Sequence, residues 1–148
     1  MKRLAIIAGL ACLILGAQAS AQTFGSVNLR SGFTPDPYRT TITSGGNVAA
    51  RNLFTNCTGW VADAVDFAVY YSAGNFNLTF SATSQADTTL IVRAPNGNFY
   101  CDDDSGPGLN PTLTIGNPGS GAYSVWIGSY RQGEYAQATL SVSEIGQR

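Results

Sequence analysis

The stretch Phe76-Asn77-Leu78-Thr79-Phe80-Ser81-Ala82 alternates apolar and polar side chains. Side chains of a β-strand point alternately to the two faces of its sheet, so this period of two places Phe76, Leu78, Phe80 and Ala82 on one face. One apolar face opposite one polar face is typical of a half-buried antiparallel strand. The stretch therefore predicts one strand of a layered β-protein.

The same period recurs along the chain after residue 22, where no helix-period stretch of useful length appears. Strands are predicted at 66–71, 88–94, 112–115, 122–129 and 136–143. The expected inward side chains are Phe67, Val69, Tyr71, Tyr123, Val125, Ile127, Ala138, Leu140 and Val142, with Trp126 on the opposite face of its strand. Short strands separated by Gly, Pro and Asn breaks predict an all-β protein, an antiparallel jelly-roll β-sandwich.

Two connections have recognisable local chemistry. Residues 95–98, Pro-Asn-Gly-Asn, carry a turn signal that predicts a hairpin between 88–94 and 99–101. The prolines of Phe33-Thr34-Pro35-Asp36-Pro37-Tyr38 push the preceding residues towards extended backbone, and this lead-in is expected to feed an edge strand at 39–43.

The N-terminus predicts export and cleavage. Lys2 and Arg3 precede an apolar run at 4–15, and Ala19-Ser20-Ala21 supplies a small-x-small end. These features are typical of a secretory signal peptide, and the run is shorter than the roughly 20 residues that span a bilayer. We expect residues 1–21 to be the signal, with cleavage after Ala21 or, as the alternative, Ala19. Residues 22–50 form the lead-in and edge strand, and 51–148 the β-sandwich, the whole of 22–148 being one domain.

The charge of the mature chain disfavours two classes of partner. Nine acidic residues face six arginines after residue 22, a net charge of about −3. Phosphate neutralisation needs a basic patch, so a nucleic-acid partner is not expected. An anionic membrane surface is disfavoured for the same reason, and no membrane insertion is expected after signal cleavage.

Two cysteines remain after cleavage, Cys57 and Cys101. An even pair in an exported chain predicts a disulfide, the alternative being two buried free thiols. The expected compartment, periplasm or medium, favours the bridge.

The catalytic residues of several enzyme classes are missing. The chain has no histidine, which excludes a Ser-His-Asp triad, a Cys-His dyad and an HExxH zinc site. Asp104-Ser105-Gly106 looks like the nucleophile motif of a trypsin-like protease, but Ser105 has no conventional base. Two carboxylates such as Asp87 and Asp103 could in principle hydrolyse a glycosidic bond across a cleft. We assign no catalytic residue and expect a non-enzyme.

The run Tyr100-Cys101-Asp102-Asp103-Asp104-Ser105-Gly106 is the strongest candidate for bound chemistry. Asp102, Asp104 and Gly106 have the alternating spacing of a calcium loop, although position twelve is Leu113 rather than the Glu of an EF-hand. Asp87, at the start of the preceding strand, is the natural additional ligand. We therefore expect Ca²⁺ at Asp87, Asp102, Asp103 and Asp104, the alternative being a solvated turn with sodium or water around it. Asp63 and Asp66, near Cys57, are further candidate ligands.

Aromatic side chains offer a second kind of site. Trp126, Tyr130 and Tyr135, with Trp60 and Tyr100 as further candidates, could stack on the apolar faces of sugars. The alternative is that they fill the core with their polar tips outward. An exposed Trp126 would favour a carbohydrate-binding module.

Four pieces of sequence, taken in order, resemble the bacterial pre-peptidase C-terminal domain. They are residues 86–92 (Ala-Asp-Thr-Thr-Leu-Ile-Val), the Pro95-Asn96-Gly97 hairpin, the acidic run at 100–106, and residues 117–128 with Gly121-Ala122-Tyr123-Ser124-Val125-Trp126-Ile127. The resemblance spans about residues 66–142. It implies a jelly-roll β-sandwich without catalysis of its own, of the kind attached to secreted peptidases, some of which bind calcium or polymers. We expect no peptidase domain beside this module, and the lead-in and cysteine pair lie outside the general pattern.

The sequence therefore predicts an exported, non-enzymatic β-sandwich for binding or structural support. Its ligand would be a protein or a polysaccharide, with calcium as a stabiliser. A carbohydrate-binding module is the alternative, and a hydrolase using aspartates is a more distant one; a peptidase assignment would be inherited from neighbouring domains.

Overall fold

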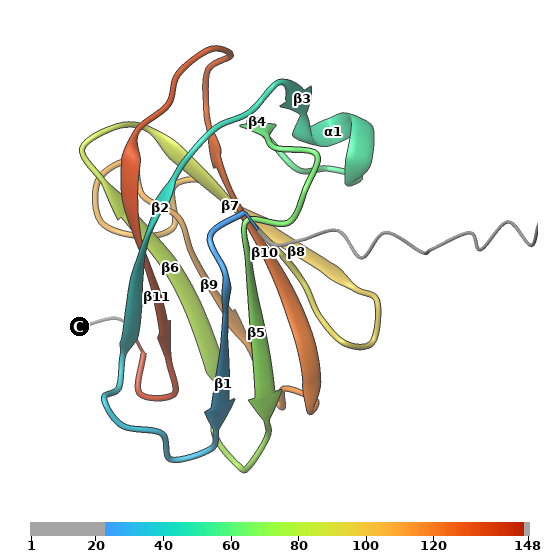
Figure 1. The fold of residues 1–148 in the computed structure, drawn as a ribbon, viewed down its shortest axis with the longest axis vertical. Helices are drawn as coiled ribbons and strands as arrows, with labels where there is room; N and C mark the ends of the chain where they lie inside the picture. Colours follow the sequence, from blue (N-terminus) through green and yellow to red (C-terminus); the bar gives the residue numbers. More distant parts are fainter. Residues whose placement is uncertain (1–22, 147–148) are drawn as a thin grey trace, which may run out of the picture.

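The computed structural model describes residues 23–146, which fold into two β-sheets packed face to face (Figure 1). The expected signal peptide and its cleavage site lie outside the described residues. No helix within 23–146 is long and apolar enough to cross a membrane.

The larger sheet has seven strands. They are β1 (Ser26–Arg30), β3 (Val48–Ala49), β4 (Trp60–Val61), β5 (Phe67–Ser72), β7 (Thr88–Arg93), β8 (Phe99–Asp102) and β10 (Gly121–Ser129). The long strand β10 is its centre. Ser124 pairs with both Ala68 of β5 and Arg93 of β7, so these strands flank β10 on opposite sides. Strand β1 joins β5 in parallel, the one departure from antiparallel pairing in the described sheets.

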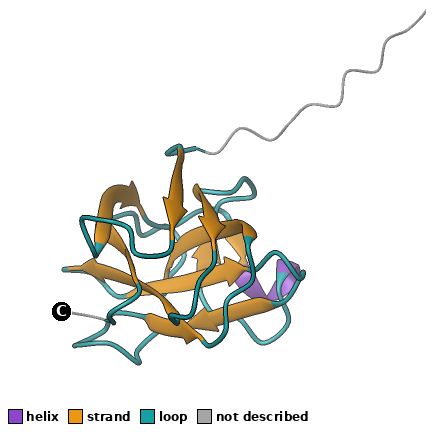
Figure 2. Cartoon of the chain, turned by 90° about the horizontal axis from the view of Figure 1, so that it is seen from below, coloured by secondary structure: helices purple, strands orange, loops and turns teal. Residues whose placement is uncertain are grey.

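The smaller sheet has four strands in the order β2 (Tyr38–Thr43), β11 (Gln137–Ser143), β6 (Leu78–Ser84) and β9 (Thr112–Ile115). Every pair in it is antiparallel. Figure 2 shows the strands layered from below, with the short helix α1 (Ala50–Leu53) at one side. This arrangement confirms the predicted all-β sandwich.

The core lies between the two sheets and is made by the predicted inward side chains. The expected sets from β5, β6, β10 and β11 are buried, and Tyr123 is fully enclosed while its hydroxyl donates to Gly119 O at 2.7 Å. The predicted alternation is therefore confirmed at these strands. Phe76 is the exception, because β6 begins only at Leu78 and leaves the Phe76 side chain 53% exposed.

A second, smaller apolar cluster covers the outer face of the larger sheet. The segment around α1 folds back and places Phe54 against Trp126, with ring centroids 4.9 Å apart. The predicted disulfide Cys57–Cys101 holds this segment to β8, with Cα atoms 5.6 Å apart. Trp126 thus points away from the main core, as predicted, and is nevertheless buried.

Candidate functional site

The acidic turn after β8 is held by its own first aspartate. The Asp102 carboxylate accepts hydrogen bonds from Ser105 N at 3.0 Å, Ser105 Oγ at 2.5 Å and Thr112 N at 2.7 Å. These bonds close the turn and tie the end of β8 to the start of β9. Asp102, predicted as a metal ligand, is thus engaged in the architecture of the turn, and Ser105 is a turn hydroxyl.

Asp87 lies near the same turn although it is fifteen residues or more away in sequence. Its carbonyl accepts a hydrogen bond from Tyr130 N at 3.1 Å, which links the start of β7 to the end of β10. Its Oδ1 is buried without a hydrogen-bond partner. Burial, and then the charges of Asp104 and Asp103, raise the pKa of Asp87 above its usual range. The charges of Asp103 and Asp104 thus reach Asp87, but the structure does not gather the four predicted metal residues into one cluster.

The fit of a calcium ion to these residues is partial. Within residues 23–146, no three His, Cys, Asp or Glu side chains are gathered closely enough to hold a metal. The orphaned Oδ1 of Asp87 is the oxygen that lacks a partner, and carboxylate oxygen is a ligand type that calcium takes. Asp87, Asp103 and Asp104 would be the protein ligands, and the remaining positions would come from backbone carbonyls or water.

A shallow groove of about 550 Å³ lies beside Asp87, between the 86–87 corner and the loop after β10. Leu109, Arg131, Glu134 and Tyr135 line it. Tyr135 is 56% exposed, and its hydroxyl donates to Asn47 Oδ1 at 3.2 Å. Arg131 and Glu134 form an exposed ion pair at 4.0 Å, which contributes little to stability in water. An aromatic side chain and a carboxylate from distant segments thus share one surface.

The three predicted aromatic ligand-binding residues do not form one platform. Tyr130 and Tyr135 are exposed, but Trp126 is only 6% exposed beneath Phe54. The indole Nε1 of Trp126 is buried without a hydrogen-bond partner. The physical reason is the covering segment: the sequence showed that Trp126 faces away from the core but not that residues 50–59 fold over it.

Asp66 is a further calcium candidate from the sequence, and the structure gives it another role. Asp66 lies at the edge of β5, is 1% exposed, and its Oδ2 accepts the Ile127 N–H at 2.9 Å. Burial raises the pKa of Asp66 to about 7, and the Ile127 hydrogen bond opposes that rise. Through this hydrogen bond, Asp66 links the start of β5 to β10.

Two further acidic side chains accept hydrogen bonds that hold distant segments of the fold together. Asp36 accepts hydrogen bonds from Ser143 Oγ and Glu144 N, and so holds the lead-in against the end of β11. Glu144 accepts hydrogen bonds from Gly32 N and the Tyr71 hydroxyl. Sequence reasoning missed these roles because both partners of each bond come from segments far apart in the chain.

The described residues form an all-β sandwich in which acidic side chains hold several connections by hydrogen bonds. No protein-family model matches the chain, and no curated protein matches it in sequence. Its structure is similar to that of PliG from Aeromonas hydrophila, a periplasmic inhibitor of g-type lysozyme, with a TM-score of 0.45 and 13% identity over 80% of this chain and 96% of that one. It is also similar to the pre-peptidase C-terminal domain of collagenase from Bacillus anthracis, with a TM-score of 0.45 and 13% identity over 80% of this chain and 93% of that one.

Proposed function

We propose that the mature chain is an extracytoplasmic, non-enzymatic β-sandwich that works by binding a polymeric ligand. The observation that supports its non-enzymatic character is the use of its carboxylates. Asp36, Asp66, Asp102 and Glu144 all accept hydrogen bonds that join distant segments. A carboxylate whose lone pairs receive backbone N–H groups is held by the fold and is poorly placed to exchange protons with a substrate.

The disulfide supports the compartment. Cys57–Cys101 links β8 to the segment that covers Trp126. Disulfides of this structural kind persist in oxidising compartments and are rare in reducing ones. Together with the signal-like N-terminus, this bond favours the periplasm or the medium as the place of action.

Calcium is proposed as a stabiliser of the acidic loop end. Asp87, Asp103 and Asp104 repel one another, and the repulsion raises the pKa of Asp87 in addition to the effect of burial. A divalent cation between them would relieve that repulsion and engage the buried Oδ1 of Asp87. Because such an ion would bind only the folded chain, it would raise the free energy of unfolding.

A carbohydrate is the alternative ligand, and the burial of Trp126 counts against the aromatic platform that the sequence indicated for it. Tyr135 is more than half exposed and lines the groove that contains Asp87, where an aromatic face could contact a sugar. Buried Trp126 would not take part. A protein ligand at the same loops is the other version.

The function is tested by co-sedimentation of the purified mature chain with insoluble polymers. The panel is cellulose, chitin, calcium-crosslinked pectate, peptidoglycan sacculi and fibrillar collagen, and each supernatant is assayed for released reducing ends and amino groups. We expect saturable retention on at least one polymer without product release. Asp87→Asn serves as the chemical control, since it removes the carboxylate with the raised pKa.

Two outcomes would overturn the proposal. Product release that grows with time and is lost in Asp87→Asn would establish a hydrolase that uses aspartates. Retention on none of the polymers would reject a polymer-binding function.

A further inference from the structure

The outer face of the larger sheet is open over part of its length. Residues 50–59 cover only the part around Trp126, and α1 lies beside one end of the sheet (Figure 1). Elsewhere the alternate residues of four neighbouring strands point outward, because the residues between them enter the core. We call this part the open face. Its residues are Ser26, Asn28 and Arg30 of β1, Ala68, Tyr70 and Ser72 of β5, Ala122 and Ser124 of β10, and Arg93 of β7. None of them is acidic.

The strand register fixes the spacing of the two arginines. The row that contains Arg93 runs through Ser124 and Ala68 to Ser26. Arg30 lies four residues beyond the β1 end of that row, and three strand spacings separate β1 from β7. At about 4.8 Å between strands and about 3.3 Å per residue, the two arginine Cα atoms are about 20 Å apart. Tyr70 lies in the row between them.

Two grooves on the open face meet at Ala122. The first has a volume of about 400 Å³ and is lined by Tyr70, Asn28 and Arg30 among others. The second has a volume of about 250 Å³ and contains Arg93. Tyr70 is 43% exposed, and its neighbours across the sheet have small side chains. The two grooves therefore form one path that runs past an accessible aromatic ring from one arginine to the other.

The polar groups of the open face are available to a ligand. Arg30 and Arg93 are exposed, and neither has a carboxylate partner within residues 23–146. Arg93 lies over the Phe99 ring at 5.8 Å, a contact that gives its N–H groups no hydrogen-bond acceptor. The exposed side chains of Asn28 and Ser72 make no hydrogen bond in the described part of the chain.

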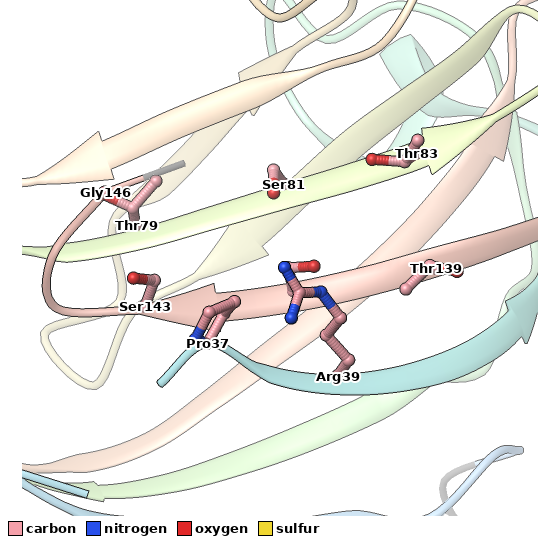
Figure 3. Close-up of a pocket in the computed structure, with 9 residues that line it drawn as sticks. Pro37, Arg39, Thr79, Ser81, Thr83, Thr139, Ser143 and Gly146 are labelled. Carbon is pink, nitrogen blue, oxygen red and sulfur yellow. The ribbon is translucent and has the colours of Figure 1, made fainter. Parts of the chain in front are cut away.

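The outer face of the smaller sheet is less available. A groove of about 300 Å³ runs along β6 and β11 there, lined by Ser and Thr side chains beside Arg39 (Figure 3). Thr79 and Ser143 of this groove are nearly buried, and their hydroxyls already form hydrogen bonds with Thr114 and Asp36. The open face of the larger sheet is therefore the better candidate for binding.

We propose that the open face binds a linear acidic polysaccharide, with a sugar ring on Tyr70 and carboxylates on Arg30 and Arg93. A guanidinium recognises a carboxylate through paired, charge-assisted hydrogen bonds. A polyuronate carries a carboxylate on every sugar unit, so a chain that follows the two grooves meets both arginines. The ring of Tyr70 can pack on an apolar sugar face, and Asn28 and Ser72 can exchange hydrogen bonds with sugar hydroxyls.

Other occupants fit the open face less well. An extended acidic peptide pairs its backbone at a sheet edge, whereas the backbone of these strands is already paired within the sheet. The face spans four strands and about five residues, roughly 20 by 17 Å, which is small beside the about 800 Å² that each partner buries in a standard protein interface. Two copies joined through this face would bring like charges together. This inference rests on the proposed binding function and names its surface and ligand class.

Binding is measured by isothermal titration calorimetry of the mature chain with hexagalacturonate. Chelator is present, so that calcium makes no contribution. Cellohexaose is the neutral control, and a Glu hexamer is the peptide control. We expect hexagalacturonate to bind about tenfold more tightly than either, or better, because it alone offers carboxylates together with sugar rings. Digalacturonate is too short to reach both arginines and should bind more weakly than the hexamer.

Charge variants locate the site. Arg30→Gln and Arg93→Gln should each weaken hexagalacturonate binding about fivefold or more. The double variant should show the product of the two effects, because residues this far apart act independently. Arg39→Gln makes the same charge change on the outer face of the smaller sheet and should leave the affinity unchanged. Thermal melts verify that each variant is folded.

Variants of Tyr70 test the aromatic contact. Tyr70→Thr removes the ring, keeps a residue that favours strands, and should weaken hexagalacturonate binding about fivefold or more. Tyr70→Phe keeps the ring and should bind like wild type. A loss of affinity that is equal in the two variants would show that the ring does not carry the contact.

The outcomes separate this inference from the function on which it rests. Wild-type affinity in the double arginine variant, equal binding of cellohexaose, or equal binding of the Glu hexamer would overturn it. If hexagalacturonate fails to bind while the chain is still retained on a polymer of the sedimentation panel, the assignment of the open face alone is wrong. Failure in both experiments would reject the binding function as well.

Discussion

At the scale of single residues, the acids of this chain divide into two groups. Asp66 and Asp102 accept hydrogen bonds inside the fold, whereas Asp87 has a buried oxygen without a partner. The first group holds strands and turns together. Asp87 belongs to the second group, in which negative charges act on one another. The charges of Asp103 and Asp104 raise the pKa of Asp87.

Asp66 should give the protein a stability that depends on pH. Its pKa is raised from 3.8 to about 7 in the folded state, so the folded chain holds the proton more tightly than the unfolded chain. This contribution is present below about pH 4 and is lost as the pH rises to about 7, a change of roughly 4 kcal/mol at most. We expect Asp66→Asn to be close to wild type at pH 4 and more stable by roughly 2 kcal/mol at pH 8.

Urea unfolding of both proteins at the two pH values measures this difference directly. The amide oxygen of the substituted side chain can still accept the Ile127 N–H, so the comparison isolates the charge. An equal loss of stability at both pH values would show that the ionised carboxylate is not the unfavourable form.

Asp87 should control the response to calcium. Without the metal, Asp87→Asn removes a charge that is repelled by Asp103 and Asp104, so we expect an equal or higher melting temperature than wild type. With calcium at ten times its Kd, the wild type should gain about 1.4 kcal/mol, or about 5 °C, and Asp87→Asn should gain much less. Differential scanning calorimetry with millimolar calcium and with chelator measures both. A wild-type melting temperature that is the same with calcium and with chelator would reject the metal proposal.

At the scale of elements, the segment at 50–59 is a cover on the outer face of the larger sheet. Phe54 lies on Trp126, and Cys57–Cys101 ties the cover to β8. The two cysteines are 44 residues apart, and the chain-entropy estimate for closing such a loop is about 4 kcal/mol.

Replacing both cysteines with alanine should therefore lower the free energy of unfolding by a few kcal/mol and loosen the cover. In a Trp60→Phe background, the fluorescence of Trp126 should shift to longer wavelength as water reaches the indole. An unchanged emission maximum together with unchanged stability would mean that the disulfide does not hold the cover in place.

Gly46, between β2 and β3, lies against the backbone of Val61. A Cβ at this position would lie 2.0 Å from Val61 O, a backbone atom that cannot move aside on its own. We expect Gly46→Ala to cost about 3 kcal/mol or more in chemical unfolding. Gly119→Ala is the matched control, because nothing lies within 4 Å of its Cβ position; similar costs for both variants would contradict the close approach.

Most of the strands and their inward-facing residues could be predicted from the sequence. Strict alternation in β6, β10 and β11 identified the inward residues, and Asn96-Gly97 identified the β7–β8 hairpin. Strand β1 and the cover were not predicted. The pairing of β1 with β5 is parallel and joins residues about 42 positions apart, and the burial of Trp126 depends on the path of residues 50–59; neither leaves a local pattern.

The candidate sites also divide into features that have a local sequence signal and features that depend on contacts between distant strands. Local spacing indicated the acidic turn, and the count of mature-chain cysteines indicated the Cys57–Cys101 pair. Proximity of Asp87 to Tyr135, and the groove over β6 and β11, arise from register between distant strands. Ser and Thr at alternate positions in both strands were visible in the sequence, but the register that aligns them across the two strands was not.

At the scale of the whole molecule, the sandwich has three differently built outer surfaces. Residues 50–59 cover part of the outer face of the larger sheet, the outer face of the smaller sheet carries Ser and Thr side chains beside Arg39, and Asp87 lies beside Tyr135 in a groove at one loop end. The strands behind these surfaces share one apolar core between the two sheets.

Asp102 is the member of the acidic run that holds the turn after β8, so its replacement shows whether these acids serve the architecture of the sandwich. The measurement is the free energy of unfolding of Asp102→Ala beside Asp104→Ala, its neighbour in the same run. We expect a loss of about 2 kcal/mol for Asp102→Ala, because three hydrogen bonds to a charged group disappear, and little change or a small gain for Asp104→Ala. Equal stability of Asp102→Ala and wild type would contradict the account.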